Sequence, residues 1–125
     1  LSSGLLTGKM TRYTIFEDDD HRKFNRNGEM FDRGETFAGV DFEKGLKGIE
    51  ELKKIKPDNM TMAQFALKWI LMHEEVSTVI AGAKNEKQVL DNIKASEIAD
   101  LDESIMKRVK EIYEEFIKED VHQRW

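Results

Sequence analysis

The sequence predicts an α/β protein whose strands alternate with helices, and whose sheet is incomplete within these 125 residues. The expected order is a strand end, a long loop, two helices, a strand and two further helices. Strands alternating with helices are typical of βα units and a parallel sheet. Two strands do not make a stable sheet, yet the predicted helices carry broad apolar faces. We therefore expect these faces to need partners from outside the chain.

Composition excludes several classes of protein. The net charge is −5, so no general attraction to nucleic acid or to anionic membranes is expected. The chain has no cysteine, which excludes disulfides and thiolate metal sites and favours a cytoplasmic location. The apolar runs fall short of the roughly 20 residues that span a membrane. The three histidines are widely spaced without carboxylate neighbours at ligand spacing, so no metal site is expected.

The first third of the chain has little regular pattern. Residues 1–9, LSSGLLTGK, are small and apolar, and we predict the end of a buried strand that runs into a turn. Residues 10–40 are predicted to form a long irregular loop. A loop of this length is unusual inside a compact domain, so it is either a lid or binding loop, or disordered. A solvated surface loop is the simple alternative.

Two helices are predicted in the middle of the chain. Apolar residues recur at three- and four-residue steps over residues 42–56, with Asp41 as the N-cap and Pro57 as the stop. The sequence Thr61-Met62-Ala63-Gln64 matches a capping box and begins a second helix over residues 62–73. This helix is apolar on most sides, so we expect it to be buried on more than one.

The last part of the chain is predicted as a strand followed by two helices. Residues 77–80, STVI, form a β-branched run that ends before Gly82, which is typical of a buried parallel strand. Helices are expected over residues 86–95 and 102–119. The second has a single apolar stripe and is otherwise charged.

A strand–glycine–helix junction at residues 79–92 is the first candidate binding site. Helix N-termini bind phosphate through free backbone N–H groups, and Lys84 adds a positive charge there. Gln88 and Asn92 lie one turn apart, so they share a face and can reach the same ligand. Gly82 allows a tight turn. Such junctions are also common where nothing binds.

The segment Leu1–Lys9 is the second candidate. It offers small side chains, exposed backbone N–H groups and one cation, which suit an anion such as a pyrophosphate. The residues concerned are Ser3, Gly4, Thr7, Gly8 and Lys9. A simple turn is the alternative.

These segments together resemble the aldo-keto reductase family. LSSGLLTGK is similar to the stretch after barrel strand seven, and TMAQFALKWILMHEEVSTVIAGAKNEKQVLDNIKAS is similar to the helix, strand eight and helix eight that follow. The ending VHQRW is also similar to the family's usual terminus. The resemblance implies a (β/α)₈ TIM barrel of about 250 residues, of which this chain is the C-terminal portion with an extra C-terminal helix. A phosphate site on the loops after strands seven and eight recurs in such barrels, and both candidate sites fall there.

The resemblance also implies roles for single residues in binding NADPH. The residues that would lie along the pyrophosphate and ribose are Leu1, Ser3, Gly4, Leu6 and Lys9. The phosphate on the adenosine ribose would be held by Gly82 and Lys84. That phosphate and the adenine edge would be reached by Gln88 and Asn92. The loop 10–40 would fold over the cofactor as a clasp or line the substrate mouth.

The family's reaction is hydride transfer from NADPH to a small carbonyl substrate, an aldehyde or a ketone. The family's catalytic tyrosine, lysine, aspartate and histidine all come from the first half of the barrel. Tyr13 and Tyr113 match no such motif, so no catalytic residue is assigned here and the chain alone is expected to be inactive. Because it begins Leu1-Ser2-Ser3 without an initiator Met, we expect a fragment that lacks the N-terminal half of the barrel.

Two alternatives stay open from the sequence. One is a non-catalytic relative that holds the cofactor as a binding or regulatory subunit, as channel partners of this family do. The other is a natural short protein that self-associates into an α-rich oligomer and so covers its apolar faces.

Overall fold

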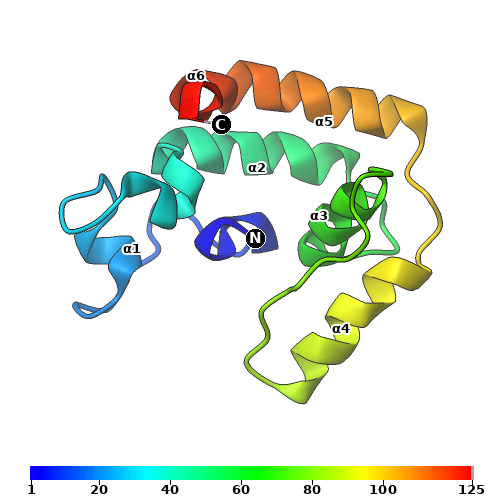
Figure 1. The fold of residues 1–125 in the computed structure, drawn as a ribbon, viewed down its shortest axis with the longest axis horizontal. Helices are drawn as coiled ribbons and strands as arrows, with labels where there is room; N and C mark the ends of the chain where they lie inside the picture. Colours follow the sequence, from blue (N-terminus) through cyan, green and yellow to red (C-terminus); the bar gives the residue numbers. More distant parts are fainter. Residues whose placement is uncertain (125) are drawn as a thin grey trace.

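The fold was analysed in a computed structural model that describes residues 1–124; Trp125, the last residue of VHQRW, lies outside the described residues. The chain forms helices connected by loops, and none of residues 1–124 is in a β-strand. Helices α2 and α5 run side by side across one edge, and α3 and α4 pack against each other (Figure 1). The longer helices are α2 (Phe42–Ile55), α3 (Met62–Leu71), α4 (Glu86–Glu97) and α5 (Glu103–Phe116). No helix of this described region is long and apolar enough to cross a lipid bilayer.

The boundaries of the middle helices follow from local capping. The Asp41 side chain accepts a hydrogen bond from the backbone N–H of Lys44 at 3.0 Å and begins α2. Helix α2 ends at Ile55, because Pro57 disfavours helical geometry in the residue before it. A complete capping box between Thr61 and Gln64 begins α3, which ends at Leu71 rather than at residue 73.

The strand predicted at residues 77–80 is not formed in this structure. This segment connects α3 to α4 as an open stretch of chain that pairs with no other segment among residues 1–124 (Figure 1). A strand needs a neighbour whose N–H and C=O groups complete its hydrogen bonds. Ile80 is 97% exposed, although its β-branched neighbours suit a buried strand. The local preference for strand therefore has no sheet to join.

The last helix is interrupted where a single helix over residues 102–119 is predicted. Helix α5 stops at Phe116, and a short helix α6 (Lys118–Val121) follows after a break at Ile117. The break turns Asp120 toward the start of α2, where its carboxylate accepts from Asp41 N at 3.0 Å and from Lys44 Nζ at 2.7 Å. These long-range contacts, which no local pattern encodes, end the helix early.

The loop 10–40 is folded rather than irregular. It contains α1 (His21–Phe24) and two short 3-10 helices, η2 (Arg33–Glu35) and η3 (Phe37–Gly39). Asn25 is fully buried and accepts hydrogen bonds from the backbone N–H groups of Met30 and Phe31 at 2.9 and 2.8 Å. Buried amides that satisfy backbone groups hold a loop in one shape. The loop is therefore held in one shape, although many of its side chains face solvent.

Aromatic side chains attach this loop to α2. The ring centroids of Phe37 and Phe42 are 5.0 Å apart, and Phe16 lies 6.2 Å from each of them. Phe37 is completely buried. Aromatic pairs at such separations add to the stabilisation from burial alone. Loop and helix thus share one core.

Two glycines in α2 differ in the room around them. A Cβ on Gly45 would lie 2.6 Å from Leu5 Cδ2, whereas a Cβ on Gly48 would meet its nearest atom, Ile117 Cδ1, at 3.6 Å. Gly45 therefore allows the N-terminal segment to approach α2 closely, and Gly48 only faces α5 at ordinary contact distance.

We predict opposite effects for alanine at these two positions. Gly45→Ala lowers the free energy of unfolding by about 1–2 kcal/mol, because overpacking against buried Leu5 exceeds the gain in helix propensity. Gly48→Ala leaves it unchanged or raises it by up to about 1 kcal/mol. Urea unfolding of both variants of the complete protein gives the two values. Equal effects would contradict the close approach at Gly45.

An ion pair fixes the start of α1. Asp20 accepts hydrogen bonds from Arg22 Nε at 2.9 Å and from Arg22 Nη2 at 2.5 Å, and Arg22 lies 4.8 Å from the centre of the Phe16 ring. The hydrogen bonds from the Arg22 side chain hold the pKa of Asp20 at about 2, below its ordinary 3.8. The pair therefore stabilises the fold while Asp20 is ionised.

This lowered pKa predicts a pH dependence of stability. The contribution of Asp20 is present above pH of about 4 and is lost as the pH falls toward about 2. We expect Asp20→Asn to reduce the fall in unfolding free energy across this range, by on the order of 1 kcal/mol once solvent screening is allowed for. Chemical unfolding of the complete protein at several pH values measures this change, with Asp19→Asn, a variant of the exposed neighbour, as control. The same slope in wild type and Asp20→Asn would refute the assignment.

Candidate functional site

The first candidate segment is a short helix and not a strand end. Residues Ser2–Thr7 form η1, which consists of two short 3-10 turns joined by a kink; Ser2, Ser3 and Gly4 there have φ of 48°, 53° and 90°. With no neighbouring strand among residues 1–124, the segment satisfies its own backbone groups, as when Gly4 N–H donates to Leu1 O at 3.0 Å. Left-handed geometry costs about 1–2 kcal/mol at a residue other than glycine. Such strain persists where the surroundings impose it, and it is concentrated at functional sites.

The loop 10–40 imposes this geometry on Ser3. The backbone N–H of Phe37 donates to Ser3 Oγ at 3.1 Å, and Arg22 Nη1 donates to the Ser3 carbonyl at 3.4 Å. Glycine suits position 4, since its φ is positive and a Cβ there would lie 3.1 Å from Met10 Cε. The hydroxyl and carbonyl oxygens of Ser3 therefore already have partners within the protein.

The other predicted residues of this segment point in different directions. Leu6 lines an apolar groove between the helices, whereas Leu1 and Lys9 are exposed to solvent. Gly8 closes η1 in the left-handed conformation, with φ of 69°. The segment thus presents one apolar side toward the helices and one solvent side that carries the Lys9 cation.

The second candidate segment, residues 82–92, is braced by its own side chains. Gln88 Oε1 accepts from the backbone N–H of Lys84 at 2.7 Å, and Asn92 Nδ2 donates to the Gly82 carbonyl at 3.3 Å. Asn85 caps α4 by accepting from Gln88 N at 3.0 Å. Gln88 and Asn92 therefore reach the same loop, as their helical spacing requires. In this structure their partners are backbone groups of the loop.

Gly82 and Lys84 are both open to solvent. Gly82 is not among the glycines with positive φ, so the tight turn inferred from the sequence does not require glycine here. A Cβ at Gly82 would meet nothing within 4 Å, which leaves space in front of its backbone. Lys84 is exposed and has no carboxylate partner among residues 1–124. A cation beside an unobstructed backbone at a helix N-terminus suits an anionic ligand.

Helix α3 supports both candidate segments. It contacts η1 on one side and α4 on the other (Figure 1). Met62, Gln64 and Phe65 are buried in these contacts. The two segments therefore have a common rigid base, although they are about 75 residues apart in the sequence.

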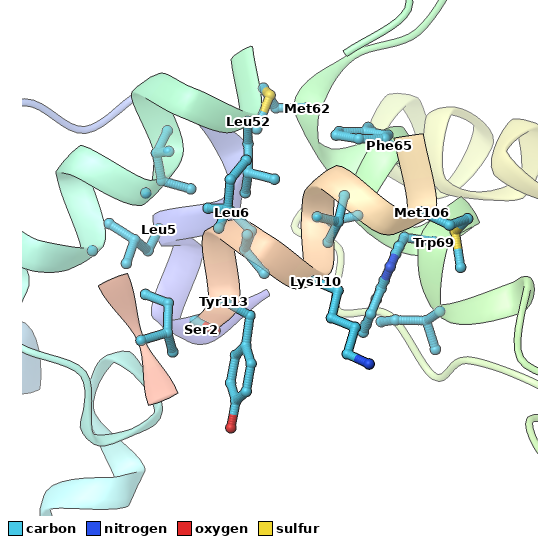
Figure 2. Close-up of a pocket in the computed structure, with 18 of the residues that line it drawn as sticks. Ser2, Leu5, Leu6, Leu52, Met62, Phe65, Trp69, Met106, Lys110 and Tyr113 are labelled. Carbon is cyan, nitrogen blue, oxygen red and sulfur yellow. The ribbon is translucent and has the colours of Figure 1, made fainter. Parts of the chain in front are cut away.

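A large apolar groove opens between η1, α2, α3 and α5. Its volume is about 1010 Å³, and Figure 2 shows the side chains that point into it. Among these are Leu5, Leu6, Leu52, Phe65, Trp69, Met106 and Tyr113. The sequence indicated apolar faces in excess of their partners but did not place them together. Trp69 is partly buried, packs against the core and forms part of the wall of this groove.

Neither tyrosine is buried in the described chain. Tyr13 is 82% exposed. Tyr113 pairs its hydroxyl with His122 Nδ1 at 3.1 Å on the surface, where the pair attaches α5 to the C-terminal turn. Among residues 1–124, no three His, Asp or Glu side chains gather at metal-binding distance.

Comparison with known proteins identifies relatives. The model of the Aldo/keto reductase family matches residues 1–114. "L-glyceraldehyde 3-phosphate reductase" of Escherichia coli O157:H7 is 29% identical over 84% of the chain and 31% of its own length. "Putative voltage-gated potassium channel subunit beta" of Schizosaccharomyces pombe is 32% identical over 90% of the chain and 31% of its own length. "Probable voltage-gated potassium channel subunit beta" of Oryza sativa subsp. japonica is 34% identical over 81% of the chain and 29% of its own length.

The match extends across both candidate segments and the helices that support them. The chain spans less than a third of the length of these relatives. The family implies a (β/α)₈ barrel, and a helical chain that carries unpaired strand-like residues fits a part of such a barrel. The chain therefore belongs to the aldo/keto reductase family.

Proposed function

We propose that this chain is the C-terminal part of an NADPH-dependent aldo-keto reductase and supplies the loops that bind the cofactor. The observation that carries the proposal is that η1, one candidate anion site, and α4, which begins at the other, both pack against helix α3. They correspond, by resemblance, to the phosphate-binding loops after strands seven and eight of a barrel. The complete protein would reduce aldehydes or ketones to alcohols. NADPH, when bound, supplies the hydride.

The residues present fit the adenosine end of NADPH. Lys84 offers an exposed cation, the backbone at Gly82 has open space before it, and the N-terminus of α4 presents backbone N–H groups. Gln88 and Asn92 hold this loop in place and lie within reach of the same ligand. The η1 segment with Lys9 would follow the pyrophosphate. Its left-handed residues Ser2 and Ser3 keep that backbone in a preset shape.

We propose further that the apolar groove is covered by the remainder of the barrel. Barrel helices bury their apolar faces against strands, and a barrel of this kind has about 250 residues. The relatives are more than three times as long as the stretch that matches them. Self-association of two copies through the groove is the alternative partner.

Lys84 provides the direct test of the cofactor assignment. In the complete protein, Lys84→Ala should weaken NADPH binding by about tenfold or more and leave NADH binding unchanged, because a charge-assisted hydrogen bond to the extra phosphate is lost. Titration of protein fluorescence with each nucleotide measures this. Lys87→Ala, which removes an exposed neighbouring cation, is the matched control. An unchanged preference for NADPH in Lys84→Ala would disprove the assigned role.

The 125-residue chain by itself should be inactive and incompletely folded. We expect no NADPH oxidation with a panel of aldehydes, strong binding of the dye ANS to the open groove, and no cooperative melting. A defined oligomer that melts cooperatively would instead support self-association. A compact monomer that melts cooperatively and binds no dye would contradict the proposal that most of the barrel is missing.

A second function is favoured by the channel-subunit relatives. The complete protein could hold NADPH as a binding or regulatory subunit without turning over substrate. Both functions require nucleotide binding by the two loops, so a measurement of NADPH affinity does not distinguish the reductase from the regulatory subunit. Turnover of carbonyl compounds by the complete protein supports the reductase, whereas tight binding of NADPH without turnover supports the regulatory role.

A further inference from the structure

The first turn of α3 touches both cofactor segments. On one side Met62 packs onto Gly8 at the end of η1, since a Cβ on Gly8 would lie only 2.8 Å from Met62 Cγ. On the other side Gln64 Nε2 donates a hydrogen bond of 2.9 Å to the backbone carbonyl of Asp91 in α4. Two residues of one helical turn thus contact two segments that are remote in the sequence.

Gln64 makes more hydrogen bonds than its capping role needs. Its backbone N–H donates to Thr61 Oγ1 at 3.2 Å, and its Oε1 accepts from Thr61 N–H at 2.9 Å, which completes the capping box. The additional bond to Asp91 uses the amide nitrogen, which the capping box leaves free. Gln64 is 7% exposed, so this bond is shielded from water.

The bond from Gln64 reaches α4 next to the residues that brace the candidate loop. Asp91 lies directly before Asn92 and three residues after Gln88, the two residues that brace the loop at Gly82 and Lys84. Beyond the end of α4, Lys68 Nζ pairs with Asp100 at 2.8 Å and gives a second attachment to α3. Without the Gln64 bond, α4 keeps its packing at the buried Ala95 and the attachment beyond its C-terminal end, whereas the exposed residues 86–90 lose the nearest tie to α3.

We infer that Gln64 is a positioning residue, which holds the N-terminal half of α4 at a fixed place relative to η1 and thereby sets the preference for NADPH over NADH. This inference rests on the proposed function of the two segments. The pyrophosphate and the adenosine phosphate are parts of one ligand, and the distance between them is limited. Both segments must therefore be correctly spaced for both groups to bind together. The first turn of α3 provides that spacing.

The test compares Gln64→Glu with Thr61→Ala in the complete protein. Glutamate at position 64 can still accept from Thr61 N–H but, when ionised, cannot donate to Asp91. Thr61→Ala removes the Oγ1 half of the capping box and leaves the bond between Gln64 and Asp91 in place. We expect Gln64→Glu to weaken NADPH binding about five- to tenfold and to change NADH binding less. Thr61→Ala should lower the melting temperature and leave the ratio of the two affinities unchanged.

The outcomes separate this inference from the proposed function. If Gln64→Glu keeps the wild-type affinity ratio while Lys84→Ala loses it, the role of Gln64 is refuted and the cofactor site stands. If the wild-type protein binds no NADPH, both proposals fall. Should Gln64→Glu not fold, Gln64→Met removes the donor without burying a charge, and the same comparison with Thr61→Ala applies.

Discussion

An excess of apolar helix surface over available partners governs this structure. Along α3 and α5, side chains such as Trp69 and Met106 face an open groove that no segment of residues 1–124 fills (Figure 2). Among residues 1–124, partners are also lacking for residues 77–80, which have no neighbouring strand. In η1 the backbone groups form hydrogen bonds within the segment. Water in contact with so much apolar surface is unfavourable, and this favours association with further protein. The family's barrel supplies surfaces of the required kind.

The proposed cofactor segments are held in place before any ligand arrives. Side chains of Gln88 and Asn92 fasten the loop at Gly82, and the loop 10–40 fastens Ser3 through Phe37 and Arg22. A preset backbone reduces the entropy lost when an anion binds. Helix α3 connects the two segments, so that a long ligand meets both at a fixed spacing. The exposed Lys84 then adds charge where the backbone is open.

The sequence predicted the helices well because their ends are encoded locally. Asp41, Thr61 and Asn85 each cap the helix that follows, and the apolar spacing identifies the buried faces. The break at Ile117 was not predictable, because it depends on contacts between Asp120 and the start of α2. For the candidate site, the two segments could be identified from glycines, a lysine and helix starts. Their common base on α3 could not, since it joins residues far apart in the chain.

By itself, the sequence determined the approximate positions of the four longer helices, the family, and the segments that carry the proposed cofactor residues. Caps, periodicity and motifs are properties of neighbouring residues. Only the tertiary structure decided that loop 10–40 joins the core, that η1 is left-handed at Ser3, and that Gln64 ties α3 to α4. It also decided that residues 77–80 do not form a strand here. Each of these features depends on which distant groups are present to complete a hydrogen bond or a packing contact, and such partners are not specified by local sequence.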